Sequence, residues 1–256
     1  MCRHLAYLGP PVTLRTLLYD PPHSLVRQSW APRDMRGGGT VNADGFGVGW
    51  YPGGVAGGVG DDGTGNPVRY RRAGPIWSDP TLPELAGVTT SGVVLAAVRS
   101  GTVGMPVQES AAAPFAEGRW LFSHNGVVRG WPDSIVTLAG GLPVRDLVTL
   151  DAPTDSALLW ALVRHRLRAG ASVAEAVTAT VREVAAVAPG SRLNLLLTDG
   201  VSVVASVWDH ALSVRVTGDA VLLASEPVDD APEWQEVPDR RWVRAGPDGV
   251  HLGELG

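Results

Sequence analysis

The first eight residues of the chain, MCRHLAYL (residues 1–8), contain Cys2, the only cysteine among 256 residues. Removal of Met1 would make Cys2 the N-terminal residue. An α-amine has a reference pKa of about 7.7–8.0 and a thiol one of about 8.5, so near neutral pH the free amine can accept the thiol proton, directly or through a water. One residue then supplies both nucleophile and base, as in enzymes with an N-terminal threonine. We predict that Cys2 is a nucleophile; the alternative is an inert thiol.

The residues that follow Cys2 predict a strand that would hold it rigidly. Cys2–Leu8 alternates in hydropathy and is followed by Gly9-Pro10-Pro11, which predicts a short strand that ends there. Further strands are predicted at Phe46–Tyr51, Val68–Arg72, Gly92–Arg99 and Trp120–His124, the last broken by Asn125-Gly126. In Phe46–Tyr51 the glycines at alternate positions suggest close approach by another backbone or a ligand.

The second half of the chain predicts two helices followed by a meander of strands. Apolar residues recur at helical spacing over Ser156–Ala169, after Thr154-Asp155, and over Ser172–Ala186. Strands are then predicted at Arg192–Thr198, Val201–Trp208, Leu212–Val216, Ala220–Ala224, Trp242–Ala245 and Val250–Leu252. Strands, a helix pair and strands again indicate an α+β layered architecture.

The composition excludes several classes of function. The net charge is −5 with no basic run, which argues against nucleic acid as a partner. All 21 basic residues are arginines, so neither a Schiff-base lysine nor a P-loop lysine is available. One cysteine rules out an internal disulfide and fits a reducing cytoplasm, and the His residues show no metal-ligand spacing. With no signal peptide or spanning apolar run, we expect a cytoplasmic protein without membrane partner, metal or cofactor.

Three sites carry residue types that suit acyl transfer to a thiol. Asn125-Gly126 offers a side-chain amide and a backbone N–H for an oxyanion hole, but Asn-Gly is also a common hairpin turn. Arg99 can clamp a substrate carboxylate bidentately, or form an ion pair with a structural Asp or Glu. Asp155 can bind a substrate ammonium, while a Thr-Asp pair ahead of a helix is also an N-cap.

Taken together, these motifs resemble the class II glutamine amidotransferases. The shared motifs, in order and over nearly the whole chain, are Cys2, Asn42–Tyr51, Arg99-Ser100-Gly101-Thr102, Ser123-His124-Asn125-Gly126, Thr154-Asp155-Ser156 and Ala224-Ser225-Glu226-Pro227. The resemblance implies an N-terminal-nucleophile (Ntn) hydrolase fold: a four-layer αββα sandwich of two antiparallel sheets between helix layers. It implies one domain over residues 2–256, with Met1 removed.

The resemblance also assigns roles to the candidate residues. Cys2 would be the nucleophile, and Asn125 with the N–H of Gly126 would form the oxyanion hole. Arg99 would hold the α-carboxylate of a γ-glutamyl group with Thr102 beside it, and Asp155 would hold its α-ammonium. This chain has Arg3-His4 where many members have Gly-Ile, and Ala97-Val98 where members often have His-Thr before the arginine. These departures leave the acyl half intact and weaken the expectation of glutamine as the substrate.

The chain ends after the glutaminase-like part, so we expect no synthase domain and no obligatory synthase partner. The branch it resembles most is the stand-alone γ-glutamyl amidohydrolases of ergothioneine biosynthesis, which release glutamate from the small molecule γ-glutamyl-hercynylcysteine sulfoxide. Two alternatives stay open. One is a glutaminase subunit that supplies ammonia to a separate synthase. The other is a non-catalytic binding module on the same scaffold, for which a retained Met1 would be the sign.

Overall fold

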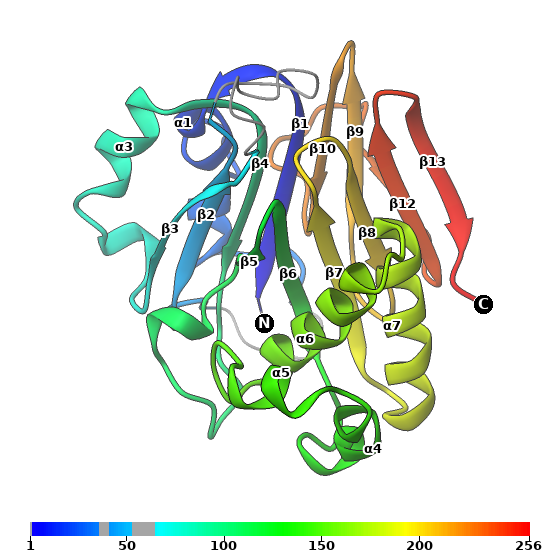
Figure 1. The fold of residues 1–256 in the computed structure, drawn as a ribbon. Coiled ribbons are helices and arrows are strands. Elements are labelled where there is room, and N and C mark those ends of the chain that lie inside the picture. Colours follow the sequence, from blue (N-terminus) through cyan, green and yellow to red (C-terminus); the bar gives the residue numbers. More distant parts are fainter. Residues whose placement is uncertain (1, 36–40, 53–64) are drawn as a thin grey trace.

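Two antiparallel β-sheets face each other in the computed structural model, which describes residues 2–35, 41–52 and 65–256. Figure 1 shows the two sheets side by side, with α6 (Asp155–Arg168) and α7 (Val173–Val187) in front of one of them. Among the described residues, the first sheet has the order β11 (Gln235–Glu236), β9 (Ser213–Thr217), β10 (Ala220–Ala224), β1 (Arg3–Thr13), β4 (Thr90–Val98), β2 (Phe46–Trp50) and β3 (Val68–Arg72). The second has the order β13 (Gly249–Glu254), β12 (Arg241–Gly246), β8 (Val203–Val207), β7 (Arg192–Thr198), β6 (Trp120–Val127) and β5 (Phe115–Glu117).

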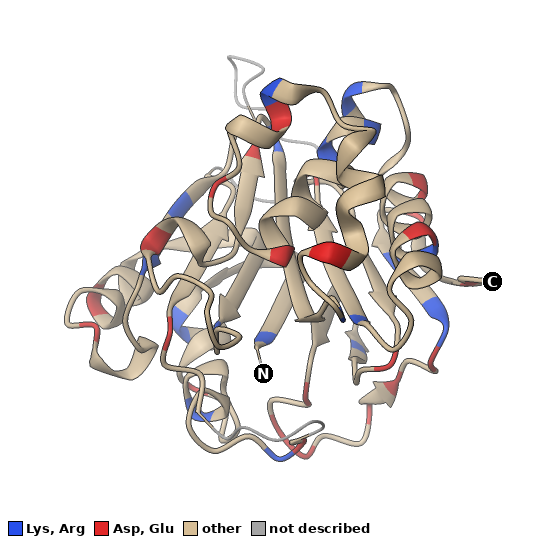
Figure 2. Cartoon of the chain, turned by 90° about the horizontal axis from the view of Figure 1, so that it is seen from below, with Lys and Arg blue, Asp and Glu red and all other residues tan. Residues whose placement is uncertain are grey.

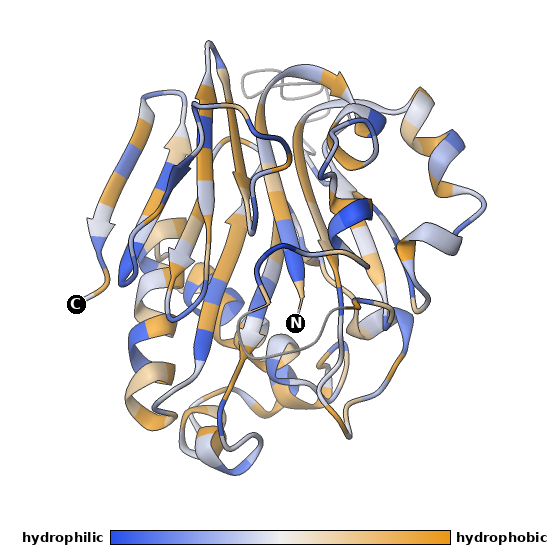
Figure 3. Ribbon diagram, turned by 180° about the vertical axis from the view of Figure 1, so that it is seen from behind, coloured by the Kyte–Doolittle hydropathy of each residue, from blue (hydrophilic) through white to orange (hydrophobic). Residues whose placement is uncertain are grey.

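Strand β1 lies inside the first sheet and is paired on both sides. Leu5 is opposite Ala224 of β10 and Ala96 of β4, and Arg3 is opposite Val98. Successive side chains of a strand point to opposite faces. In β1, Leu5 and Tyr7 join the core on the outer face, whereas Ala6 and Leu8 join the core between the sheets. Figure 3, coloured by hydropathy, shows hydrophobic stretches along the strands with hydrophilic bands among them.

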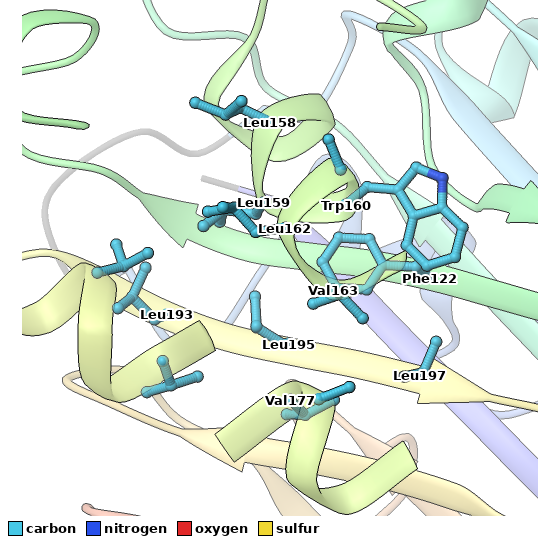
Figure 4. Close-up of a cluster of buried hydrophobic side chains, with 14 of the residues drawn as sticks. Phe122, Leu158, Leu159, Trp160, Leu162, Val163, Val177, Leu193, Leu195 and Leu197 are labelled. Carbon is cyan, nitrogen blue, oxygen red and sulfur yellow. The ribbon is translucent and has the colours of Figure 1, made fainter. Parts of the chain in front are cut away.

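Helix layers cover the outer faces of both sheets, as the αββα expectation requires. On the second sheet, α6 and α7 pack their apolar faces against β6 and β7; the stacked rings of Phe122 and Trp160, with centroids 5.4 Å apart, form part of this core (Figure 4). The outer face of the first sheet is covered by α1 (Leu14–Leu18), α2 (Leu25–Gln28) and α3 (Leu82–Val88). The shorter helices α4 (Val136–Gly140) and α5 (Val144–Val148) precede α6. The predicted α+β class is confirmed.

The two long helices begin at capping residues. The Oγ1 of Thr154 accepts a hydrogen bond from the N–H of Ala157 at 3.2 Å, so Thr154 is the N-cap of α6 and Asp155 is its first residue. Ser172 and Glu175 form a reciprocal capping box at the start of α7. No described helix is both long and apolar enough to cross a bilayer.

Two predicted strand ends are wrong by more than two residues. Strand β6 does not break at Asn125-Gly126 but continues to Val127, because the ladder with β7 continues through Asn194 and Leu193. Strand β1 does not end at Gly9-Pro10-Pro11 but runs to Thr13, with a register shift between Leu8 and Val12 that absorbs the prolines.

The alternate glycines of β2 permit close approach by backbone. A Cβ on Gly47 would lie 2.3 Å from the carbonyl oxygen of Ala113, and one on Gly49 would lie 2.7 Å from Leu121. The second sheet and the segment before β5 therefore pack directly on β2.

Candidate active site

Cys2 immediately precedes β1, at the end of the molecule where the two sheets open. Its thiol is partly buried, and its Sγ lies 3.8 Å from the carbonyl oxygen of Ser100. Alternation along β1 gives Cys2 the same face as His4 and Ala6, toward the second sheet. Figure 2 views the molecule from below and shows that β1 begins near the middle of that face, among strand ends of both sheets. The thiol therefore directly precedes a strand that is paired with β4 from Arg3 and with β10 from Leu5, and it is only partly buried.

A buried ionic network holds Cys2 through its neighbour Arg3. The Arg3 side chain is 1% exposed; it forms an ion pair with Glu226 at 2.5 Å and donates to the carbonyl oxygen of Cys2 at 2.9 Å. Glu226 also bonds His23 Nε2 at 2.7 Å and accepts from the N–H of Arg33 at 2.8 Å. Burial alone would raise the pKa of Glu226, but the His23 hydrogen bond, the Arg3 charge and the Arg33 N–H together lower it to about 2. In the sequence, Glu226 is recognisable only as part of the motif Ala224-Ser225-Glu226-Pro227, which does not predict this ionic network.

The Asn125 amide is buried and tied to the same strand through Ser225. Asn125 Nδ2 donates to Ser225 Oγ at 2.9 Å, and Ser225 Oγ also accepts from the N–H of His4 at 3.0 Å. Asn125 Oδ1 is buried with no hydrogen-bond partner among the described residues. Since Asn125 lies within β6, the alternative of a hairpin turn is wrong. A single serine thus links the candidate oxyanion-hole amide to β1, two residues from the thiol.

Gly126 is glycine for a steric reason as well. A Cβ there would lie 1.8 Å from the carbonyl oxygen of Arg192 and 2.7 Å from His124 Nε2. That carbonyl accepts from His124 Nε2 at 3.0 Å, and His124 Nδ1 bonds Ser156 Oγ at 3.0 Å. No other residue could bring its backbone so close to β7.

Asp155 is fixed at the end of β6. Its Oδ2 accepts from the N–H of Val128 at 3.0 Å, and its Oδ1 accepts from the N–H of Ser156 at 2.7 Å. The side chain is buried, and Thr154 performs the capping. The Asp155 carboxylate is thus bound to the backbone of Val128, which is three residues after Asn125 in the chain.

The Arg99 guanidinium is buried, and no acidic side chain of the described residues pairs with it. Its Nη1 donates to the carbonyl oxygens of Asp44 at 3.2 Å and Pro106 at 2.9 Å. Its Nη2 is buried and has no hydrogen-bond partner among the described residues. The described residues therefore show no structural ion pair between Arg99 and an Asp or Glu, which was the alternative. A buried, unpartnered guanidinium N–H is costly unless a ligand pairs with it.

The loop that follows Arg99, the candidate carboxylate clamp, contacts the thiol. Ser100, whose carbonyl contacts Cys2, is the neighbour of Arg99, and the N–H of Gly101 donates to Asp44 Oδ2 at 2.8 Å. Thr102 lies exposed on this loop. The structure thus brings Cys2, Arg99 and Asn125 to one end of the space between the sheets, with Asp155 behind the end of β6 and Thr102 on the rim.

The histidine nearest to Cys2 in the chain is not placed to act as its base. His4 is buried between the sheets, its Nδ1 3.2 Å from Ser123 Oγ. Burial, followed by the charges of His210, His124 and Arg3, lowers the pKa of His4 well below its ordinary value, so it is neutral at pH 7. In the described ranges, no group of three or more His, Cys, Asp or Glu side chains could hold a metal ion.

Comparisons with known proteins agree on one family. Residues 23–218 match the family described as "Glutamine amidotransferases class-II". The chain is 41% identical over 244 residues to the "Gamma-glutamyl-hercynylcysteine sulfoxide hydrolase" of Mycolicibacterium smegmatis, covering 95% of each protein. It is 41% identical over 256 residues to the protein of the same name from Mycobacterium tuberculosis, covering 100% of this chain and 97% of the relative. A solved "glutamine aminotransferase class-II domain protein" of Silicibacter pomeroyi has a similar fold, with a TM-score of 0.65 at 24% identity over 100% of both chains.

Proposed function

Because this chain belongs to the class II glutamine amidotransferases, we propose that it is an N-terminal-cysteine amidohydrolase that cleaves the γ-glutamyl amide of γ-glutamyl-hercynylcysteine sulfoxide. The products are glutamate and hercynylcysteine sulfoxide. Support for the reaction comes from the Cys2 thiol, which contacts the carbonyl oxygen of Ser100, and from the neighbouring Arg99, whose buried Nη2 has no hydrogen-bond partner among the described residues. Support for the substrate comes from the two relatives that carry this hydrolase name at 41% identity over nearly their full length.

The first chemical step forms a thioester. Met1 lies outside the described residues, and its removal frees the α-amine of Cys2 to accept the thiol proton. The thiolate attacks the γ-carbonyl carbon, and the oxyanion receives hydrogen bonds from Asn125 Nδ2 and the N–H of Gly126. The tetrahedral intermediate collapses as the C–N bond breaks, and the Cys2 ammonium gives its proton to the leaving amine.

The second step regenerates the enzyme. The same α-amine takes a proton from water, which attacks the thioester carbon through a second tetrahedral intermediate in the same oxyanion hole. The C–S bond breaks, the thiol regains its proton, and glutamate leaves. The α-amine acts as base because the described contacts of the thiol include no imidazole, and because burial lowers the pKa of His4 so far that its ring is a weak base.

The γ-glutamyl group is recognised by charge. The Arg99 guanidinium binds its α-carboxylate through the unpartnered Nη2, with Thr102 beside it, and the Asp155 carboxylate binds its α-ammonium. These three residues hold the acyl half in place while the leaving amine is exchanged for water.

The chain from Cys2 onward acts as one domain, in the cytoplasm and without a synthase partner. Two of its relatives have nearly the same length as this chain and are named as hydrolases, which favours this function over a glutaminase subunit. A non-catalytic module is likewise not favoured.

The experiment compares glutamate release from glutamine and from a γ-glutamyl-cysteine sulfoxide conjugate at equal concentration. Mass spectrometry first establishes that Met1 is absent from the sample. We expect the conjugate to be preferred by well over tenfold, a difference above about 1.4 kcal/mol in transition-state binding. Cys2→Ala should abolish turnover without changing the melting temperature. A preference for glutamine, or turnover by a clean Cys2→Ala sample, would contradict the proposal.

A further inference from the structure

We propose that the guanidinium of Arg192 binds the carboxylate of the departing amino acid and so makes the site selective for γ-glutamyl amino acids over glutamine. This role rests on the proposed function and names the part of the substrate that the acyl-binding residues leave unassigned. From the sequence alone, Arg192 is predicted only to begin a strand.

The position of Arg192 in β7 directs its side chain into the space between the sheets. Alternate residues of β7 join the core under α6 and α7, namely Leu193, Leu195 and Leu197. Leu196, on the other face, joins the core between the sheets. Arg192 is four residues from Leu196 and therefore points to the same face of the second sheet. This face is turned toward the first sheet, and Cys2 points toward it from the other side.

The strand order puts Arg192 and Arg99 on opposite sides of β1, the strand that follows Cys2. Strand β6, which carries Asn125, contacts both β1 and β4. Arg99 extends from β4 toward the segment before β2, where it contacts Asp44. Arg192 is on β7, the strand next to β6 in the second sheet. The strand after it, β8, shares a core with β9 and β10, which lie on the side of β1 away from β4.

The electrostatic effect of Cys2 on Arg192 agrees with this arrangement of the strands. Burial lowers the pKa of Arg192, the positive charge of Arg129 lowers it further, and the Cys2 thiolate opposes these effects. Arg129 is exposed, and its backbone N–H is anchored to Ser191 Oγ at 3.0 Å. The charge of Arg129 thus adds to that of Arg192, and both favour an anion near Arg192.

The chemistry of a γ-glutamyl amide fits this arrangement. With the γ-carbonyl at Cys2 and the α-carboxylate at Arg99, the amide nitrogen and its substituent extend away from Arg99, toward Arg192. If the leaving amine is an amino acid, its carboxylate is attached to the carbon next to that nitrogen. Glutamine has only hydrogens on that nitrogen and would gain nothing from Arg192. A guanidinium binds a carboxylate through two parallel hydrogen bonds, so the preference is for a carboxylate in this position.

The test uses two substrates that differ only in this carboxylate. One is γ-glutamyl-S-methylcysteine sulfoxide, and the other is the γ-glutamyl amide of 2-(methylsulfinyl)ethylamine. We compare kcat/KM for wild type, Arg192→Gln and the control Arg244→Gln, which removes a half-buried arginine of β12 that pairs with Asp248. Arg192→Gln should lower kcat/KM about 10- to 100-fold for the carboxylate substrate. It should change the value for the other substrate less than threefold, and the control should change neither.

The outcomes separate this inference from the proposed function. Equal losses on both substrates would mean that Arg192 acts on the thiol or on the fold, and would overturn the inference. An unchanged preference in Arg192→Gln would overturn it as well. If wild type releases glutamate from neither substrate, the proposed function itself fails. A melting curve for each variant identifies any loss caused by unfolding.

Discussion

Replacing Glu226 with glutamine tests whether the buried network at the end of β1 supports both stability and catalysis. The substitution keeps the shape of the side chain and removes its charge. It leaves the 1%-exposed Arg3 without its counter-ion and places an amide where the N–H of Arg33 and the ring of His23 now meet a carboxylate. Removing one partner of a buried ion pair is costly because the other charge remains buried.

The magnitude follows from the pKa of Glu226. The pKa falls from 4.5 to about 2 on folding, and each pH unit between these values corresponds to about 1.36 kcal/mol. The carboxylate therefore contributes about 3 kcal/mol to the free energy of unfolding at pH 7. Because its pKa is lowered in the folded state, this contribution is complete above about pH 4.5 and declines as the pH falls toward 2.

The assay is chemical denaturation of wild type and Glu226→Gln at pH 7, 5 and 3.5. We expect the free energy of unfolding of the variant to be lower than that of wild type by about 3 kcal/mol at pH 7 and 5. At pH 3.5 this difference should be smaller by about 1.4 kcal/mol. The matched control is Glu254→Gln, an exposed partner of Arg241, which should cost less than about 1 kcal/mol. A Glu226→Gln difference below 1 kcal/mol, or one that does not change with pH, would refute this account. The variant should also have a lower kcat, because Arg3 holds the carbonyl of Cys2.

Three further predictions concern the candidate site. Asn125→Ala should lower kcat about 100- to 1000-fold at saturating substrate, since it removes an oxyanion donor; a loss below tenfold would exclude that role. Gly126→Ala should lower the melting temperature strongly because its Cβ would collide with a β7 carbonyl, whereas Gly140→Ala, which has open space around it, should not; equal melting temperatures would contradict the steric argument. Arg99→Lys should raise KM about tenfold or more with a smaller effect on kcat, because an ammonium cannot form the bidentate pair; an unchanged KM would remove Arg99 from substrate binding.

Local patterns were sufficient to predict most of the strands and both long helices. Val68–Arg72, Arg192–Thr198 and Ala220–Ala224 match β3, β7 and β10 residue for residue, because turn residues bound each apolar or alternating run. Asn125-Gly126 was misread as a break because it has the sequence of a turn, and only the tertiary pairing with β7 overrides that preference. The short β5, α4 and α5 were missed, since runs of three to five residues carry too little periodicity.

The candidate site was predictable only where its chemistry is carried by single residues. Cys2, Asn125 and Arg99 were identified from residue type and motif, and the structure brings them to one end of the space between the sheets. The supporting contacts join residues far apart in the chain, as in the Arg3 pair with Glu226, and no pattern in the sequence reports such a pairing. The selectivity proposed for Arg192 depends in the same way on which strands face each other.

The double pairing of β1 also sets the order of events during synthesis of the protein. Its neighbours are β4 and β10, and the contacts that anchor its start come from Ser225 and Glu226. On the ribosome the first residues emerge long before residue 226 is made, so the N-terminus stays accessible to an aminopeptidase throughout translation. On the proposed mechanism, excision of Met1 therefore precedes assembly of the site, and Cys2, the proposed nucleophile, acquires its surroundings only after residues 225 and 226 have been made.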